Sequence, residues 1–309
     1  MNCITDNPPA PIQDTFFRVS WWNGGGKVRT RLCSNPELRK FLSKKPDIFV
    51  YGEAETSSPL DLNIDGYVCH LHESRLNLAG NLRRGLAIFY LKKYQYRFTK
   101  IYASRNYDII WMRLKTSGEI LHFCFFYAPG SHHPLPIRSK FYDHFSSELT
   151  KFAALGKVYL MGDTNARLGS FLDDKNVHGE LISNPNKSLF LEFLEYSGLI
   201  VMNNKYCRGV ATYEIIGKKR SIIDLCLTNN PDSVTDLKIE HTPFGVNCQT
   251  CHKALTATIR IKPFERVPTS VTRRITYGRI TRKKQKKVIS QVTNQLVALS
   301  NTGELIIHS

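Results

Sequence analysis

The sequence predicts an α/β sandwich, because many short β-prone runs alternate with a few helical segments along the chain. The predicted strands cover residues 66–71, 85–91, 107–114, 120–127, 157–162, 199–203, 221–227, 236–240 and 254–261. At 309 residues, of which 42% are hydrophobic, the chain can bury one sizeable core. We therefore expect one domain followed by a tail.

Three segments have the spacing of helices. Residues 35–42 open with a capping asparagine and a proline in the first turn, and Pro46 ends the segment. The other two helices are predicted over 137–152 and 187–196, and Gly198 ends the second of them.

The composition points to a polyanionic partner. The formal net charge is +17 at pH 7 and the isoelectric point is about 9.6. Basic side chains that neutralise phosphates release counterions, which supplies most of the non-specific affinity for nucleic acid. Charge alone does not distinguish DNA from RNA or from an acidic membrane surface.

The sequence contains no signal for membrane insertion or export. No apolar stretch approaches the roughly 20 residues that a membrane span needs. Residues 1–13 are polar and contain prolines, which is not the pattern of a signal peptide. We therefore expect an intracellular protein with no membrane partner.

A carboxylate and an amide follow one predicted strand at the point where it ends. The apolar run 158–160 leads through Gly162 to Asp163 and Asn165. Side chains alternate along a strand, so Asp163 and Asn165 are expected to point to the same side. Alone, this segment favours a turn in which Asp and Asn bond their own backbone. It is a candidate site only if partners exist elsewhere.

Five other predicted strands carry a candidate polar group. Asn23 ends an aromatic run, Glu53 follows a short apolar strand and a glycine, and Tyr127 precedes a Pro-Gly break. Asp224 lies inside an apolar run and His252 begins the last strand. Taken singly, Glu53 is more typical of a solvated turn, Tyr127 of a core edge and His252 of a structural histidine. Their joint order favours a functional site.

In this order, these motifs resemble the endonuclease/exonuclease/phosphatase superfamily, and within it most closely the apurinic-like endonuclease domains of non-LTR (LINE-type) retrotransposons. The resemblance covers residues 16–262 and leaves an N-terminal extension over 1–15 and a basic tail over 263–309. Further retrotransposon-like segments lie at 84–90, 107–111, 178–186 and 211–213. The resemblance implies a DNase I-like fold with four layers, in which helices flank two facing β-sheets. It also implies hydrolysis of phosphodiesters in DNA.

A divalent cation is the cofactor that this chemistry implies. Hydrolysis needs an activated water, neutralisation of the phosphate charge and stabilisation of the departing 3′ oxyanion. Mg²⁺ prefers oxygen ligands and keeps several waters, so Glu53 is the best candidate ligand, with Asn23 assisting. Mn²⁺ is the alternative. The resemblance also implies that Ser221 contacts the DNA backbone.

The resemblance implies roles for the remaining candidates. Asp163 orients and deprotonates the attacking water, and Asn165 helps to hold the water and the phosphate. Asp224 orients and charges His252, which contacts a phosphoryl oxygen, because an acidic neighbour favours the protonated imidazole. Tyr127 donates a hydrogen bond to the phosphate or to the leaving group.

The sequence departs from the family pattern beside the histidine. That pattern is Ser-Asp-His, whereas this chain has Thr250, Cys251 and His252. A thiol is a poor ligand for Mg²⁺, and thiolates favour Zn²⁺ or Cu⁺. We therefore expect catalysis to be weakened or lost, unless the other candidate groups suffice. Gly52 in place of Gln and Gly130 in place of Asn are typical of subfamily variation.

The eight cysteines indicate reduced core residues rather than a disulfide framework, because Cys69, Cys124 and Cys226 lie in apolar strands. Cys248, Cys251 and the histidine that follows match the haem-attachment pattern. We expect no haem, because there is no export signal and the sequence continues into a strand. Structural zinc is not expected either, since no second cysteine pair of matching spacing accompanies this one.

The segment from Pro263 onward has a different composition. It contains Arg273 and Arg274 and a basic run over 282–287, followed by apolar residues at near-helical spacing. A nucleic-acid arm or nuclear address and a solvated linker helix remain equally open.

Three functions remain open. The leading one is a metal-dependent endonuclease of a mobile element, which nicks DNA in the nucleus and leaves a 3′-hydroxyl. The second is an abasic-site DNA repair endonuclease. The third is a catalytically impaired remnant that binds nucleic acid, which Cys251 favours. The retrotransposon-like motifs and the basic tail favour the first, and no protein partner is predicted.

Overall fold

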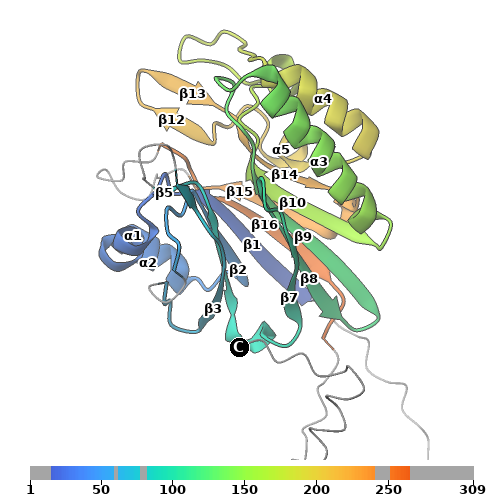
Figure 1. Cartoon of the computed structure of the whole chain (residues 1–309). Helices are drawn as coiled ribbons and strands as arrows, with labels where there is room; N and C mark the ends of the chain where they lie inside the picture. The colour runs from blue at the N-terminus through green and yellow to red at the C-terminus, as the bar shows by residue number, and fades with distance from the viewer. Residues whose placement is uncertain (1–14, 59–61, 77–81, 241–250, 265–309) are drawn as a thin grey trace, which may run out of the picture. The chain divides into compact units, whose positions relative to one another are not determined.

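Two six-stranded β-sheets form the centre of the structure (Figure 1). The computed structural model describes residues 15–58, 62–76, 82–240 and 251–264. The first sheet has the order β15 (Val234–Ile239), β16 (Leu255–Ile261), β1 (Thr15–Asn23), β2 (Ile48–Gly52), β6 (Leu86–Leu91) and β3 (Tyr67–His72). The second has the order β11 (Ile200–Val201), β14 (Asp224–Thr228), β10 (Lys157–Asp163), β9 (Glu119–Tyr127), β8 (Asp108–Thr116) and β7 (Phe98–Ala103). Two small hairpins pair β4 (Arg75–Leu76) with β5 (Leu82–Arg83) and β12 (Tyr213–Ile215) with β13 (Lys219–Ser221).

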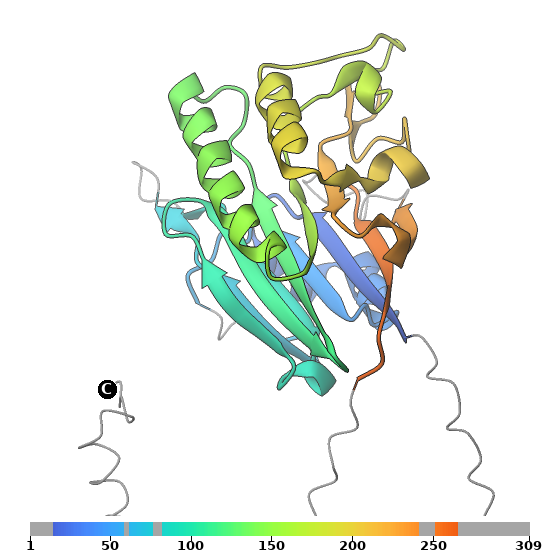
Figure 2. The same cartoon turned by 90° about the vertical axis from the view of Figure 1, so that its right-hand side faces the viewer.

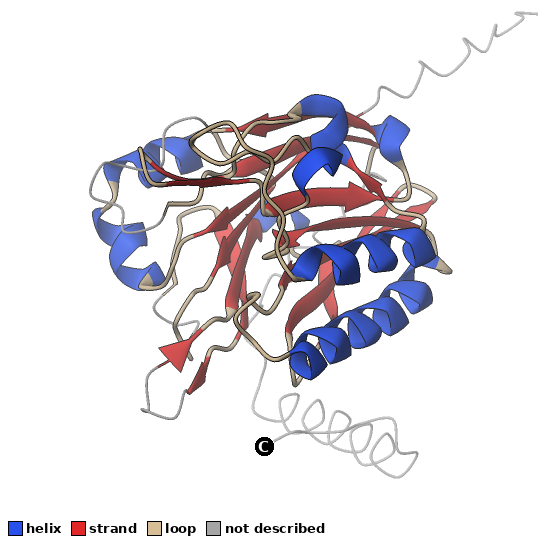
Figure 3. Ribbon diagram, turned by 90° about the horizontal axis from the view of Figure 1, so that it is seen from above, coloured by secondary structure: helices blue, strands red, loops and turns tan. Residues whose placement is uncertain are grey.

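Helices cover the outer faces of both sheets and so complete four layers (Figure 2). The first sheet carries α1 (Val28–Ser34) and α2 (Pro36–Ser43). The second carries α3 (Leu135–Ala153) and α4 (Asn186–Ser197), which lie side by side (Figure 3). The shorter helical segments are α5 (Met202–Tyr206), η2 (Lys92–Tyr94), η3 (Gly169–Phe171) and η4 (Pro231–Ser233).

Local sequence signals set the helix ends. Asn35 caps α2, because its Oδ1 accepts the N–H of Leu38 at 2.9 Å, and Pro36 occupies the first turn. Gly198 ends α4 with a φ of 63°, a conformation that glycine adopts without strain. The three predicted helices are confirmed.

Strand alternation divides the core into layers. In β9, Phe123 and Phe125 pack between the two sheets, whereas Cys124 and Phe126 pack beneath α3 and α4. The ring of Phe123 lies 5.8 Å from that of Phe17 in β1, which joins the sheets. Burying each of these phenylalanines stabilises the fold by on the order of 2 kcal/mol.

The structure differs from the predictions in α1, β7 and β11. The sequence patterns miss α1, which contains the β-branched Val28 and Thr30 and has no side-chain cap. They also miss β7. The predicted strand 199–203 is wrong in its second half, because the helix α5 begins at Met202.

The predicted strand 221–227 is divided in two. Ser221 ends β13, and β14 begins only at Asp224. The N–H groups of Ile223 and Asp224 donate to Oγ1 of Thr212, both at 3.0 Å. These bonds turn the chain from the hairpin into the second sheet and fix the position of Asp224.

Among the helices that the structure describes, none is both long and apolar enough to cross a membrane. Residues 1–14 and 265–309 lie outside the described part of the chain. The predicted domain boundaries and the two interpretations of the basic tail therefore stay predictions.

Candidate active site

The predicted site residues lie at one edge of the two sheets. Asn23 ends β1, and Asp163 ends β10 opposite Tyr127 of the parallel strand β9. Because β14 is antiparallel to β10, its first residue, Asp224, pairs with Asp163. His252 precedes β16, which is antiparallel to β1, so it reaches the same edge. Register alone therefore brings together residues that are far apart in sequence.

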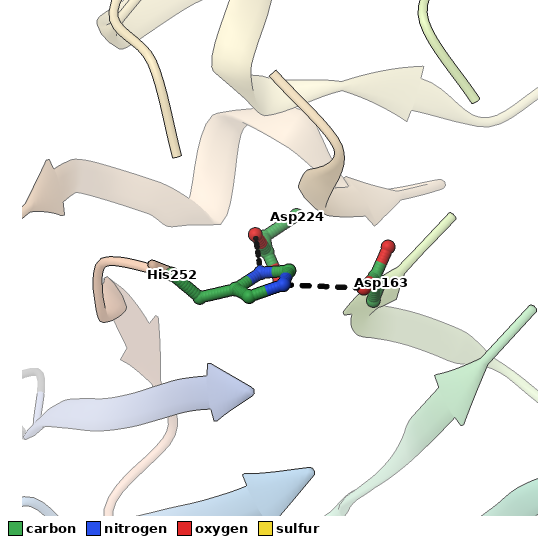
Figure 4. A group of neighbouring side chains, drawn as sticks. All are labelled: Asp163, Asp224 and His252. Atoms are coloured by element: carbon green, nitrogen blue, oxygen red, sulfur yellow. Dashed lines mark hydrogen bonds and ion pairs between the residues drawn. The ribbon is translucent and has the colours of Figure 1, made fainter. Parts of the chain in front are cut away.

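An imidazole lies between two buried carboxylates (Figure 4). His252 Nδ1 lies 2.8 Å from Oδ2 of Asp224, which is a hydrogen bond. His252 Nε2 lies 3.9 Å from Oδ2 of Asp163, an ion-pair distance. All three residues are buried. The predicted pairing of Asp224 with His252 is present in the structure.

Three further groups fix Asp224. The indole N–H of Trp21 donates to Asp224 Oδ1 at 2.8 Å, so both carboxylate oxygens have a donor. The backbone N–H of Asp224 bonds Thr212, and its carbonyl accepts from Asn203 Nδ2 at 3.1 Å. This carboxylate is held rigidly and in turn orients the imidazole.

The electrostatics favour a protonated imidazole. Burial opposes the charge on His252, but the carboxylates of Asp224, Asp163 and Glu53 outweigh it and raise its pKa to about 9. Burial and the neighbouring Asp224 raise the pKa of Asp163 to about 7, against the opposing effect of His252. Near neutral pH the site therefore holds a hydrogen-bond donor in His252 and a proton acceptor in Asp163.

Asn23 connects this group to Glu53. Its Nδ2 donates to Glu53 Oε1 at 2.9 Å and to Asp163 Oδ2 at 3.0 Å, and its Oδ1 accepts the N–H of Gly25 at 3.0 Å. Glu53 is half-buried, and within the described ranges its Oε2 accepts no hydrogen bond. An oxygen of this kind, at the rim of an acidic site, suits a hard cation.

The donor set fits Mg²⁺ or Mn²⁺ at Glu53 better than at the buried histidine. Donor atoms of Asp163, Asp224 and His252 lie within 4.8 Å of one another. However, a protonated imidazole repels a dication and has no lone pair to offer it. Glu53 offers a carboxylate oxygen, with the Asn23 amide beside it. The assignment of Glu53 and Asn23 as metal ligands stays a prediction.

Tyr127 and Asn165 form the opposite side of the site. Burial, Glu53 and Asp163 raise the pKa of Tyr127, so its hydroxyl remains a donor. The neighbouring Asn165 opposes this rise, and its Nδ2 donates to the carbonyl of Ala128 at 2.8 Å. Both predicted residues therefore lie at the site.

The predicted reason for the position of Asn165 is wrong. The strand ends at Asp163, and Asn165 has a φ of 48°, so strand alternation does not apply to it. Its backbone N–H donates to Asp163 Oδ1 at 2.8 Å. The segment is the Asx turn that the sequence also allowed, and this turn orients the Asp163 carboxylate.

Solved structures of DNA-processing enzymes share this architecture. The endonuclease domain of TRAS1, a telomere-specific non-LTR retrotransposon, superposes with a TM-score of 0.56 and 15% identity, over 80% of this chain and 99% of that one. AP endonuclease LMAP from Leishmania major superposes with a TM-score of 0.65 and 13% identity, over 80% and 88%. A variant of the 3′ phosphatase NExo from Neisseria, bound to a product DNA hairpin, gives 0.62 and 15%, over 79% and 99%.

The chain has the DNase I-like fold. The predicted four-layered sandwich and the resemblance to the endonuclease/exonuclease/phosphatase superfamily are confirmed at the level of fold. No family model and no curated protein matches the sequence.

Cys251 lies beside the DNase I-like site without joining its acidic cluster. Cys251 neighbours Tyr213, and burial and this cysteine raise the pKa of the Tyr213 hydroxyl. The Tyr213 ring in turn contacts His252 edge-on, with centroids 4.9 Å apart. The substitution therefore leaves the pairing of His252 with Asp224 in place. Cys248 lies outside the described residues, so the haem expectation stays a prediction.

The structure shows the surroundings of three further positions that the sequence singled out, which are Ser221, Gly52 and Gly130. Ser221 is buried opposite Tyr213 in the β12–β13 hairpin, and its contact with DNA stays a prediction. A Cβ atom added at Gly52 would lie 2.9 Å from the Trp21 ring, and one at Gly130 would lie 2.7 Å from the His132 ring. Neighbouring rings therefore fill the space that a side chain would need at either glycine.

Sequence reasoning missed three residues that support the site. The sequence pattern could have identified Trp21, because it lies two residues before Asn23 on the same strand and so shares its face. Thr212 lies in a segment that the resemblance singles out, although its hydroxyl contact with the backbone of Asp224 has no sequence signature. Asn203 follows a two-residue strand, and no pattern marks it.

Proposed function

We propose that this chain is a metal-dependent endonuclease that nicks DNA and leaves a 3′-hydroxyl, as the endonuclease of a non-LTR retrotransposon does. One observation carries the proposal. A continuous set of contacts runs from Asp224 through His252 to Asp163, and from Asp163 through Asn23 to Glu53. The net charge of +17 and the DNA-processing activities named for the structural neighbours support DNA as the substrate.

The side chains have complementary roles in phosphodiester hydrolysis. Asp163 accepts a proton from the attacking water, and the Asx turn at Asn165 aims its carboxylate. The charged imidazole of His252 donates to a non-bridging oxygen, on which negative charge develops. The protonated hydroxyl of Tyr127 donates to the phosphate. A bound Mg²⁺ or Mn²⁺, held by Glu53 with Asn23, would neutralise the phosphate and the departing 3′ oxygen.

Cys251 favours the second candidate function, a weakened nuclease that still binds DNA. Where the family pattern has a carboxylate, a thiol adds neither charge nor a hard ligand. Because Cys251 neighbours Tyr213 and is not part of the cluster of Asp163, Asp224 and His252, we propose that it slows the reaction without abolishing it. Nicking of chromosomal DNA also implies a nuclear location, which we propose on that ground.

A plasmid-nicking assay tests the proposed function. Purified protein is incubated with supercoiled plasmid in Mg²⁺ or Mn²⁺, with a chelator as the cation control. We expect open-circular product that a polymerase can extend, and a loss of at least about 100-fold in rate for Asp163→Ala. Asp236→Ala is the matched control, because Asp236 pairs with Lys238 on the solvent-exposed side of β15. Absence of nicking by the wild-type chain in either cation removes the proposal.

The same preparation separates repair from retrotransposition. A repair enzyme cleaves a duplex that carries one abasic site far faster than an intact duplex of the same sequence. We expect the two duplexes to be nicked at similar rates. A large preference for the abasic duplex would favour the repair function instead.

A further inference from the structure

Arg84 lies beside Tyr127 at the rim of the candidate active site. Its carbonyl accepts the N–H of Glu55 at 2.9 Å and the hydroxyl of Ser74 at 2.8 Å. These bonds attach its backbone to the segments that follow β2 and β3. Its φ of 64° places it in the left-handed region, which is uncommon for a residue with a Cβ atom. The backbone is thus held in a conformation that directs this side chain toward the site.

Three groups hold the Arg84 side chain. Its guanidinium carbon lies 5.7 Å from the centroid of the Tyr127 ring, a cation–π distance. One terminal nitrogen, NH1, lies 3.9 Å from Oδ2 of the buried Asp108. The other, NH2, lies 2.9 Å from Nε2 of His133. The guanidinium therefore has a defined position, although 29% of the side chain is exposed to solvent.

Most of the hydrogen-bonding capacity of Arg84 is unused. A guanidinium has five N–H donors, and the distance from NH1 to Asp108 is too long for a hydrogen bond. In the part of the chain that the structure describes, His133 is the one group that accepts from it. Burial, His132 and Arg84 lower the pKa of His133, which suits a neutral, accepting ring. The guanidinium is partly exposed and keeps unused donors, and its planar fork matches the oxygens of a phosphate.

We propose that Arg84 binds a backbone phosphate that flanks the scissile phosphate. This inference rests on the proposed function. The scissile group belongs between Asp163, His252 and the Tyr127 hydroxyl, whereas the guanidinium of Arg84 packs against the Tyr127 ring. Arg84 therefore contacts the DNA strand one step away from the reacting bond. It positions the substrate, and it takes no part in proton transfer.

A salt titration of DNA binding tests this role. Binding of a labelled duplex is measured by fluorescence anisotropy in chelator, where no cleavage occurs, over a range of salt concentrations. Each phosphate contact contributes about 0.9 to the slope of log affinity against log salt. We expect Arg84→Gln to reduce the magnitude of that slope by about 0.9, which is the contribution of one phosphate contact. In the nicking assay the same variant should raise KM about tenfold and change kcat little.

Arg83→Gln is the matched control. Arg83 is the preceding residue, is 58% exposed and pairs with Glu55 at 2.7 Å, so its charge is already engaged. We expect its salt slope to equal that of the wild type. Arg84→Lys keeps the charge but loses the fork, so it should keep the slope and still bind more weakly. If Arg84→Gln does not fold, the lysine variant decides, because wild-type affinity in that variant overturns the proposal.

The possible failures are distinguishable. A wild-type chain that binds and nicks DNA, together with an Arg84→Gln variant of unchanged slope, overturns the role of Arg84 alone. Equal losses of slope in the Arg83 and Arg84 variants also overturn it, because the contact would then be general surface attraction. A wild-type chain that neither binds nor nicks DNA removes the proposed function itself.

Discussion

Nδ1 of His252 lies 2.8 Å from Oδ2 of Asp224, and this hydrogen bond joins the segment that precedes β16 of the first sheet to β14 of the second. The other oxygen of Asp224 is occupied by the indole of Trp21. The imidazole therefore cannot rotate without losing its partner, and its Nε2 stays directed toward Asp163. A single buried carboxylate sets both the orientation and the charge of the histidine.

The charge of His252 depends on Asp224. Its pKa is raised to about 9 because the carboxylates outweigh the effect of burial. Asp224→Asn removes the nearer carboxylate, so burial should lower the pKa of His252 by at least one unit. An NMR titration of the imidazole in chelator measures both values, and the exposed His132 serves as an internal reference for the spectra. An unchanged pKa in the variant would show that Asp224 does not charge the imidazole.

Stability should fall as the pH rises through the range in which His252 loses its proton. The folded pKa is about 9 and the ordinary value is 6.5, so the folded state binds more protons than the unfolded state between them. The stabilisation is complete below pH 6.5 and is lost by about pH 9, with a total of about 3 kcal/mol. Urea unfolding of the wild type and His252→Gln across this range checks the prediction. The variant should lack this part of the pH dependence. Equal slopes of the unfolding free energy against pH in the two proteins would contradict the prediction.

The Trp21 indole should matter for catalysis through Asp224. Trp21→Phe keeps an aromatic ring but removes the N–H that donates to Asp224 at 2.8 Å. A hydrogen bond to a charged group is worth on the order of 2 kcal/mol, so kcat should fall at least about tenfold. Trp111→Phe is the matched control, because Trp111 is equally buried and no described group accepts from its N–H. That variant should lose stability only, and equal losses of kcat in the two variants would contradict the role of Trp21.

Cys251 should limit the rate rather than the binding of DNA. Cys251→Asp restores the carboxylate of the family pattern, and we expect the nicking rate to rise on the order of tenfold. Cys251→Ser is the control, because it removes the sulfur without adding charge. Equal rates for the aspartate, serine and wild-type proteins would mean that this position does not limit catalysis. Rates are compared at saturating DNA, so that binding does not contribute.

The sequence predicts the location of the site better than its local geometry. β1, β9 and β10 each end in a polar residue and Glu53 directly follows β2, and apolar strands of this kind are recognisable from composition. Their convergence follows from the pairing of Asp163 with both Tyr127 and Asp224, which no local pattern encodes. The expectation that these residues converge came from the resemblance to the endonuclease/exonuclease/phosphatase superfamily.

Strand and helix patterns did not predict three local features of the site. Asn165 belongs to an Asx turn whose φ of 48° strand periodicity does not anticipate. The predicted strand 221–227 breaks because the hydroxyl of Thr212 captures two backbone N–H groups. Asn203 reaches Asp224 from a helix that follows a two-residue strand. The Asx turn is a local contact between Asp163 and Asn165, whereas Thr212 and Asn203 act on the backbone near Asp224 from positions distant in sequence.

The central claim is that Asp163 and His252 act on one phosphodiester in a single site. A mutant cycle of nicking rates measures this directly, with Asp163→Asn, His252→Gln and the double variant compared under single-turnover conditions in Mg²⁺. Residues that act as a unit have strongly non-additive effects. We predict that each single variant loses at least about 100-fold in rate and that the double variant is slower than either by less than about tenfold. Losses that multiply in the double variant, or single variants that nick at the wild-type rate, would contradict the account.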